Sequence, residues 1–256
     1  WVFDKAISKQ NKTGHPGDLA ILYDQKRKFI GIGLFDPESP LRIRVLHQGS
    51  PAVLDTEWFV EKLNRIFAIR TRLINDQMTT GYRLVSGEND GMPGLVVDRY
   101  ADTLVFKLDT VSWLPHLDYL KQIFIDLIQP ERIVLRISRT VADSPSCPEQ
   151  LKVGCVIYGP VLDGPVIFQE NGLKFEAEPI IGQKTGFFLD QRDNRARVGE
   201  LARRKDVLNV FSYTGGFSLY AASNGAKSVT SLDLSRPALD AALNNFKLNI
   251  SNSEIS

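Results

Sequence analysis

The apolar and polar residues near the start of the chain alternate in a pattern that predicts a small β-barrel. Residues 18–23 and 29–35 are apolar runs that can pair across a short polar turn. Residues 41–46 alternate apolar with basic positions, so Arg42 and Arg44 should share the outer face of a half-buried strand. Such a face can contact phosphate, although a solvated face is the commoner outcome.

A segment with helical periodicity follows the barrel and leads into a second run of strands. Asp55 or Thr56 is a suitable N-cap for a helix over residues 55–77, which carries an apolar stripe through Trp58 and Phe59. We expect this helix to link the barrel, residues 1–54, to an α+β domain at residues 78–180. The elements predicted in that domain are strands at 82–85, 95–100, 104–108 and 132–137, a helix at 117–128, and a hairpin of strands 166–169 and 173–178.

Residues 206–235 predict a β-α-β unit and are the most informative part of the chain. Its first strand, helix and second strand are predicted at 207–211, 217–222 and 227–232. Asp233 follows the second strand, and a glycine-containing turn at 212–216 follows the first. Ligands of open α/β sheets bind outside the carboxyl ends of the strands. The turn and Asp233 should therefore face one ligand, with Asp233 accepting hydrogen bonds from two ribose hydroxyls.

The residues of the turn indicate which nucleoside cofactor fits the predicted site. A dinucleotide site requires spaced glycines, G-x-G-x-x-G, whereas Gly215 and Gly216 are adjacent. The turn contains no Lys or Arg that would favour a phosphate. A neutral, partly aromatic turn with a ribose-binding carboxylate fits S-adenosylmethionine, which carries a sulfonium and an amino acid instead of phosphates. A structural β-α-β unit with a chance Gly-Gly pair is the alternative.

The segment before this unit, residues 182–195, is polar but contains the apolar side chains Phe187, Phe188 and Leu189. It directly precedes a predicted helix at 192–203, and helix N-termini attract carboxylates. We expect the segment to cover the cofactor. An ordinary helix-capping loop is the alternative.

The composition argues against several classes of function but indicates no further functional site. The net charge is +1, from 31 Lys and Arg against 30 Asp and Glu, so any surface for nucleic acid must be local. Cys147 and Cys155 lie apart from any cluster of His or Cys, which argues against a zinc site and against a disulfide framework. This use of cysteine favours a reducing compartment, and we expect a cytoplasmic protein. No apolar run approaches the roughly 18 residues of a membrane span. We therefore expect no metal and no membrane partner.

The ends of the sequence lead us to expect a fragment of a longer protein. The chain begins at Trp1 without an initiator Met, within a segment that already has the pattern of structure, and the second strand of the β-α-β unit is followed by one helix before Ser256, whereas a doubly wound sheet needs more strands. Catalytic residues carried by later strands would lie beyond Ser256, and the fragment alone would be inactive.

Four motifs together resemble one known family. They are GHP at 14–16, VSGENDGMPGLVVDRY at 85–100, GQKTGFFLDQR at 182–192 and NVFSYTGGFSL at 209–219. The chain resembles, over essentially its whole length, the ribosomal RNA large-subunit methyltransferase I family of class I S-adenosylmethionine-dependent enzymes. The resemblance implies an α/β multidomain fold: a PUA-like RNA-binding barrel, a central β-β-α-β-β domain, and the first part, residues 181–256, of a Rossmann-like methyltransferase domain.

The resemblance also implies a reaction and a set of residues. Characterised members methylate carbon 5 of cytosine in 23S ribosomal RNA, so the expected partner is ribosomal RNA, with a homodimer as a further hypothesis. The family's catalytic cysteine lies beyond Ser256, and neither Cys147 nor Cys155 stands in its place. By resemblance, the turn at 212–216 would border the methionine part of the cofactor, and Asp233 would bind the ribose hydroxyls. The segment at 182–195 would help to close the pocket. The candidate cofactor-binding residues are Phe188, Asp190, Gln191, Arg192, Phe211, Ser212, Tyr213, Thr214, Gly215, Gly216, Phe217, Asp233, Leu234 and Ser235.

Two other functions stay open from the sequence. A non-catalytic RNA-binding protein could retain the β-α-β unit for structural reasons, although an intact Gly-Gly turn and Asp233 argue against decay. A methyltransferase acting on a small molecule is disfavoured by the barrel.

Overall fold

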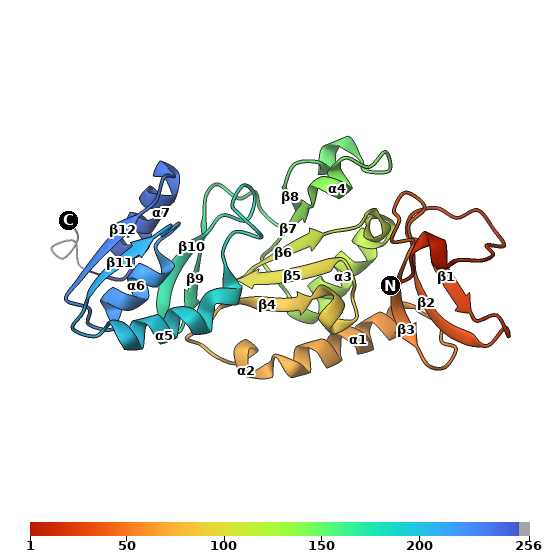
Figure 1. Ribbon diagram of the computed structural model, residues 1–256, viewed down its shortest axis with the longest axis horizontal. Helices are drawn as coiled ribbons and strands as arrows, with labels where there is room; N and C mark the ends of the chain where they lie inside the picture. Colours follow the sequence, from red (N-terminus) through yellow and green to blue (C-terminus); the bar gives the residue numbers. More distant parts are fainter. Residues whose placement is uncertain (251–256) are drawn as a thin grey trace. The chain divides into compact units, whose positions relative to one another are not determined.

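The computed structural model describes residues 1–250, and their contacts divide the chain into two compact units (Figure 1). Unit 1 comprises residues 1–75 and 83–162. Unit 2 comprises residues 76–82 and continues from Asp163 onward. No helix within residues 1–250 is both long and apolar enough to cross a bilayer.

Unit 1 begins with the predicted barrel strands. β1 (Leu19–Tyr23), β2 (Phe29–Phe35) and β3 (Ile43–Gln48) form an antiparallel sheet in that order. A short 3-10 turn, η1 (Asp4–Ala6), precedes them, and Val2 pairs with Ile43 through hydrogen bonds of 2.9 and 3.0 Å.

The expected outer face of Arg42 and Arg44 is not a free basic surface. Arg44 forms an ion pair with the buried Asp36 at 3.5 Å, and burial lowers the pKa of its guanidinium. Arg42 donates to the backbone carbonyls of Asp36 and Pro37. Both cations hold the loop after β2 in place, so this face is occupied by the protein's own oxygens.

The predicted helix at 55–77 is divided in two. α1 (Thr56–Ile69) is capped by Asp55, whose side chain accepts from the Trp58 amide at 3.0 Å, as predicted. The helix breaks at Arg70, and α2 (Thr71–Ile74) follows. At this break the Arg70 side chain donates to Asp90 at 2.6 Å and to the carbonyl of Arg83.

A five-stranded sheet forms the centre of unit 1. Its strand order is β4 (Gly81–Ser86), β5 (Leu95–Tyr100), β6 (Thr103–Leu108), β7 (Arg132–Ile137) and β8 (Cys155–Tyr158). β6 and β7 are parallel and joined by the crossover helix α3 (Leu117–Ile128), while β5–β6 and β7–β8 are antiparallel. The short elements between them are η2 (Gly87–Asp90), η3 (Val111–His116), α4 (Arg139–Ala142) and η4 (Glu149–Leu151).

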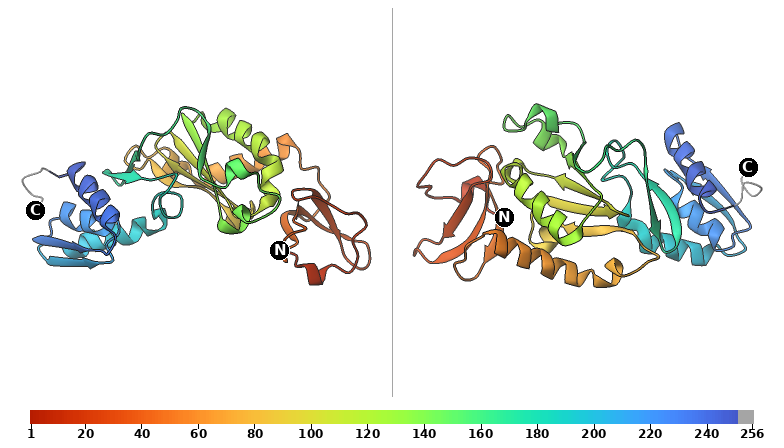
Figure 2. Two further views of the ribbon diagram at one scale, coloured as in Figure 1. Left: turned by 90° about the horizontal axis from the view of Figure 1, so that it is seen from above. Right: turned by 180° about the vertical axis from the view of Figure 1, so that it is seen from behind.

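Aromatic side chains fill the space between this sheet and its helices. Phe124 of α3 contacts Phe106 of β6 and Phe67 of α1, with ring centroids 4.8 and 5.8 Å apart. The amphipathic period of each helix therefore turns its apolar face to one side of the sheet. Seen from behind, α3 lies in front of the strands (Figure 2).

Unit 2 starts with the predicted hairpin. β9 (Val166–Glu170) and β10 (Leu173–Ala177) form a two-stranded antiparallel sheet across a turn at Asn171-Gly172. The hairpin packs on the helices of unit 2, where Asn245 accepts a hydrogen bond from the Glu176 amide at 2.8 Å. The contacts thus divide the chain before this hairpin, whereas the predicted domain boundary follows it.

The β-α-β unit has the predicted topology. β11 (Asp206–Val210) and β12 (Ser228–Leu232) are parallel neighbours, and α6 (Gly216–Ser223) connects them. Polar side chains join strands and helix, with Ser218 bonded to Asn209 at 2.9 Å and to Ser231 at 2.7 Å. The remaining elements of unit 2 are η5 (Leu189–Gln191), α5 (Arg192–Ala202) and α7 (Arg236–Lys247).

Candidate functional site

The turn after β11 has an unusual backbone. Phe211, Tyr213 and Gly215 have φ angles of 61°, 49° and 72°, in the left-handed region. Non-glycine residues adopt this region at a cost and often do so at ligand-binding sites. The strained path leaves the Phe211 side chain 83% exposed, directly beyond the carboxyl end of the strand.

The glycine pair is required by packing on the protein side of the turn. A Cβ on Gly215 would lie 2.8 Å from the Cβ of Ala242 in α7, and one on Gly216 would lie 3.0 Å from Cδ of Arg195 in α5. Any side chain would push the turn outward. The Gly-Gly pair therefore lets α7 and α5 hold the backbone close to the sheet.

Asp233 connects the end of β12 to this turn. Its Oδ2 accepts from the Tyr213 amide at 2.8 Å, and its Oδ1 accepts from the Ser235 amide at 2.9 Å. These bonds, from Ser235 first and Tyr213 second, hold the pKa of the carboxyl below its usual range. Each carboxylate oxygen retains acceptor capacity, because it can take more than one hydrogen bond.

The two residues after Asp233 differ in role. Ser235 caps α7, since its hydroxyl accepts from the Ala238 amide at 3.4 Å. Leu234 is 99% exposed and stands free of the protein core. Both follow the carboxylate directly, and the backbone amides of both bond to it. Contact of Leu234 and Ser235 with the cofactor stays a prediction.

The segment before α5 reaches the turn through an aromatic contact. Phe188 and Tyr213 meet edge to face, with ring centroids 5.3 Å apart. Lys184 lies 4.6 Å above the Phe188 ring and 3.0 Å from both oxygens of Asp190. Burial would raise the pKa of Asp190, but the hydrogen bonds and charge of Lys184 lower it overall.

Gln191 and Arg192 are placed less directly. Gln191 bonds to Asp190 and Asn194, and Arg192 bonds to Asp193. Within residues 1–250 these hydrogen bonds stay at the start of α5, so the structure brings Phe188, and not these two residues, against the turn. Thr214 contributes its carbonyl to a bond from Asn245, and Phe217 is half-buried in the first turn of α6.

These residues fit S-adenosylmethionine. The Ser212 hydroxyl is buried without a hydrogen-bond partner in the described part of the chain, which leaves a polar atom for a ligand. Asp233 has acceptor capacity for a diol, and Phe188 with Tyr213 offers aromatic surface for a cationic sulfonium.

Two residues that position the site were not predicted. Arg195 of α5 forms a buried bidentate ion pair with Glu170, at 2.7 Å for each bond, and donates to the Phe188 carbonyl at 3.0 Å. Asn245 of α7 is fully buried and donates to the Thr214 carbonyl at 2.9 Å. The burial of Asn245 could have been predicted from its spacing, because it continues the buried stripe of Ala238 and Ala242 along the helix.

The two cysteines are unsuited to act as thiolates. Cys147 is buried in an apolar cluster with Val111 and Val141, and burial raises the pKa of its thiol. Burial also raises the pKa of the Cys155 thiol in β8. Both are therefore held in the unreactive thiol form near neutral pH, which agrees with the sequence-based assignment of neither as nucleophile.

Comparisons with known proteins match both ends of the chain. The PUA-like domain family matches residues 1–48, and the S-adenosylmethionine-dependent methyltransferase family matches residues 156–254. A ribosomal RNA large subunit methyltransferase of Deinococcus radiodurans is 50% identical over 97% of this chain. A ribosomal RNA large subunit methyltransferase I of Aliivibrio fischeri is 35% identical over 97% of this chain. The chain spans 62% of the length of each of these relatives.

Solved structures share the fold. A structure from Streptococcus mutans, described as a candidate SAM-dependent methyltransferase, superposes with a TM-score of 0.78 at 24% identity, over 93% of this chain and 60% of that one. SMU.776, described as a candidate methyltransferase with SAH, gives a TM-score of 0.79 at 24% identity over the same shares.

On an α/β fold, the chain thus carries one segment that matches PUA-like domains and one that matches S-adenosylmethionine-dependent methyltransferases. This confirms the predicted fold class and the predicted cofactor class. The curated relatives confirm the more particular prediction, the resemblance to the ribosomal RNA large-subunit methyltransferase I family.

Proposed function

We propose that the protein containing this chain transfers a methyl group from S-adenosylmethionine to a base of large-subunit ribosomal RNA, at carbon 5 of a cytosine. The observation that carries the proposal is the meeting of Phe188, Tyr213 and Asp233 at the carboxyl ends of β11 and β12. The names of the relatives from Deinococcus radiodurans and Aliivibrio fischeri support ribosomal RNA as the substrate.

The residues of the site bind and orient. The cofactor supplies an electrophilic methyl group when bound. Asp233 accepts from the ribose hydroxyls and keeps its negative charge because backbone amides bond to it. Phe188 and Tyr213 exclude water from the methionine side, and the Ser212 hydroxyl is available to a polar group there. Catalysis of this kind comes from positioning two reactants.

Carbon 5 of cytosine needs activation. A thiolate that adds to carbon 6 makes carbon 5 nucleophilic, and loss of the carbon-5 proton later releases the thiolate. Cys147 and Cys155 have raised thiol pKa values and do not serve this purpose. In the proposal the nucleophile is a different residue of the full-length protein.

The test is methyl transfer by the full-length protein from labelled S-adenosylmethionine to unmodified large-subunit rRNA, followed by nucleoside analysis. We expect label in 5-methylcytidine. Label in another nucleoside would overturn the assignment of carbon 5, and label only in protein or small metabolites would overturn the RNA substrate.

Two finer statements belong to the same proposal. A ribosomal substrate favours a cytoplasmic location. The homodimer stays a prediction, and sedimentation equilibrium of the full-length protein tests it, since a single species at the monomer mass would contradict it.

A further inference from the structure

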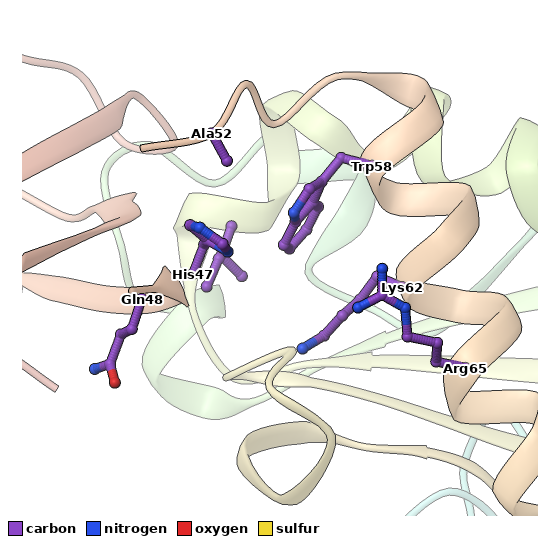
Figure 3. Close-up of a pocket in the computed structure, with 7 residues that line it drawn as sticks. His47, Gln48, Ala52, Trp58, Lys62 and Arg65 are labelled. Atoms are coloured by element: carbon purple, nitrogen blue, oxygen red, sulfur yellow. The ribbon is translucent and has the colours of Figure 1, made fainter. Parts of the chain in front are cut away.

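Unit 1 contains a hollow of about 430 Å³ between the end of β3 and the first turns of α1 (Figure 3). Trp58 and Lys62 extend from α1 toward His47 and Gln48 at the end of β3. The hollow has the size of a small-ligand site. Its lining residues are Leu46, His47, Gln48, Ala52, Trp58, Lys62 and Arg65.

The indole of Trp58 is held rigidly at the hollow. Its ring meets Phe59 edge to face at 4.9 Å and His47 at 6.1 Å between centroids. His47 is itself fixed by a 2.7 Å hydrogen bond between Nε2 and the Ser50 carbonyl. A half-buried indole with fixed neighbours offers a flat surface at little cost in side-chain entropy.

The cation beside this indole is the ammonium of Lys62. Lys62 Nζ lies 5.9 Å from the Trp58 ring centroid and forms no ion pair within residues 1–250. Burial and the like charge of Arg65 lower the pKa of Lys62, while Asp90 opposes this effect. Asp90 is already bonded to Arg70 at 2.6 Å. A desolvated ammonium in this position gains from an external anion.

Arg65 adds a second lining side chain that is cationic at neutral pH. Arg65 forms an ion pair with Glu61 at 2.6 Å, and both side chains are mostly exposed. No carboxylate is among the lining residues. Gln48 adds an amide that can donate and accept hydrogen bonds, and it also borders a second hollow of about 260 Å³ beside Trp1 and Pro93.

We propose that this hollow binds one unpaired nucleotide of RNA, with the base stacked on Trp58 and a phosphate at Lys62. Proteins recognise unpaired RNA bases by stacking them on aromatic rings, while lysines neutralise the phosphates. The inference rests on the proposed function, because it takes RNA to be the substrate. It adds a binding site formed by residues of unit 1, whereas the cofactor turn belongs to unit 2.

The test measures binding of the full-length protein to a short single-stranded oligoribonucleotide and to the duplex of the same sequence, over a range of salt concentrations. Trp58→Leu should weaken single-strand binding about tenfold with an unchanged salt slope, because only stacking is lost. Trp58→Phe should stay within about threefold of wild type, since a ring remains.

Lys62→Gln should weaken binding and also reduce the slope of log affinity against log salt by about 0.7, the value for one contact to a single strand. Lys121→Gln is the matched control, because Lys121 lies on α3 of the same unit and pairs with Asp118 at 2.6 Å. It should change neither affinity nor slope.

The outcomes separate this inference from the proposed function. If wild type methylates rRNA while Trp58→Leu and Lys62→Gln bind the single strand as wild type does, the nucleotide site is wrong and the function stands. A preference for duplex, or a Lys62→Gln slope equal to that of wild type, also overturns the site. If wild type neither binds nor methylates RNA, both proposals fail.

Discussion

At the scale of single residues, the cofactor turn depends on buried polar groups behind it. Glu170 and Arg195 have side-chain exposures of 0% and 3%, and their ion pair fixes the Phe188 carbonyl. Asn245 does the same for the Thr214 carbonyl. The backbone around Phe188 and Tyr213, which we predict to contact the cofactor, is thus held in place by Arg195 and Asn245.

Arg195→Met should lower the free energy of unfolding of the full-length protein by about 3–5 kcal/mol, because the buried Glu170 charge loses its partner. Urea unfolding measures this. Arg197→Met is the matched control on the same helix, whose pair with Glu200 is exposed, and it should cost only about 0–1 kcal/mol. Equal effects of both substitutions would contradict a stabilising role specific to the buried pair.

The depressed pKa of Asp233 predicts how binding depends on pH. Since backbone amides favour the charged form, this carboxylate stays ionised until the pH falls below the value of about 3.9 for an unperturbed Asp. The contribution of Asp233 is therefore present above the ordinary range of an aspartate pKa and is lost as the pH falls through its lowered pKa. Calorimetric titration of S-adenosylmethionine should show constant affinity from about pH 8 to pH 5, and a steep decline within that window would contradict the prediction.

At the scale of elements, local patterns predicted structure well wherever the cause was local. Leu117–Ile128 and Arg132–Ile137 have the predicted bounds, because an amphipathic period and Pro130 define the helix end and an apolar run defines the strand. The break of the linker helix at Arg70 could not be predicted. Arg70 at this break bonds to Asp90, a partner twenty positions away that only the fold brings near.

Gly81 at the start of β4 shows how closely the elements pack. A Cβ at this position would lie 2.0 Å from Cδ2 of Phe168, which is buried in an aromatic cluster with Phe175 and Phe187. Gly81→Ala should therefore lower the free energy of unfolding by about 1–3 kcal/mol. Gly164→Ala is the control, since its added Cβ would meet no atom within 4 Å. A destabilisation by Gly81→Ala no larger than that of the control would show that the cluster adapts.

At the scale of the whole molecule, the order of segments was predictable and the contacts between distant segments were not. The barrel strands, four of the five strands of the central sheet and the β-α-β unit follow from periodicity, whereas β8 was not predicted as a strand of this sheet. The turn with Asp233 follows from the position of ligands in α/β sheets. Arg195, Asn245 and the hollow beside Trp58 depend on pairs far apart in the sequence. The sequence around Arg195 and Asn245 gives no local indication that they bond to Glu170 and to the hairpin residue Glu176.

The central claim is that the turn and Asp233 together bind S-adenosylmethionine, and calorimetric titration of the full-length protein tests it most directly. Wild type should bind, Asp233→Asn should bind at least about tenfold more weakly because a charged acceptor is lost, and Asp240→Asn on the exposed side of α7 should bind as wild type does. Absence of binding by wild type, or equal affinity for wild type and Asp233→Asn, would contradict the claim.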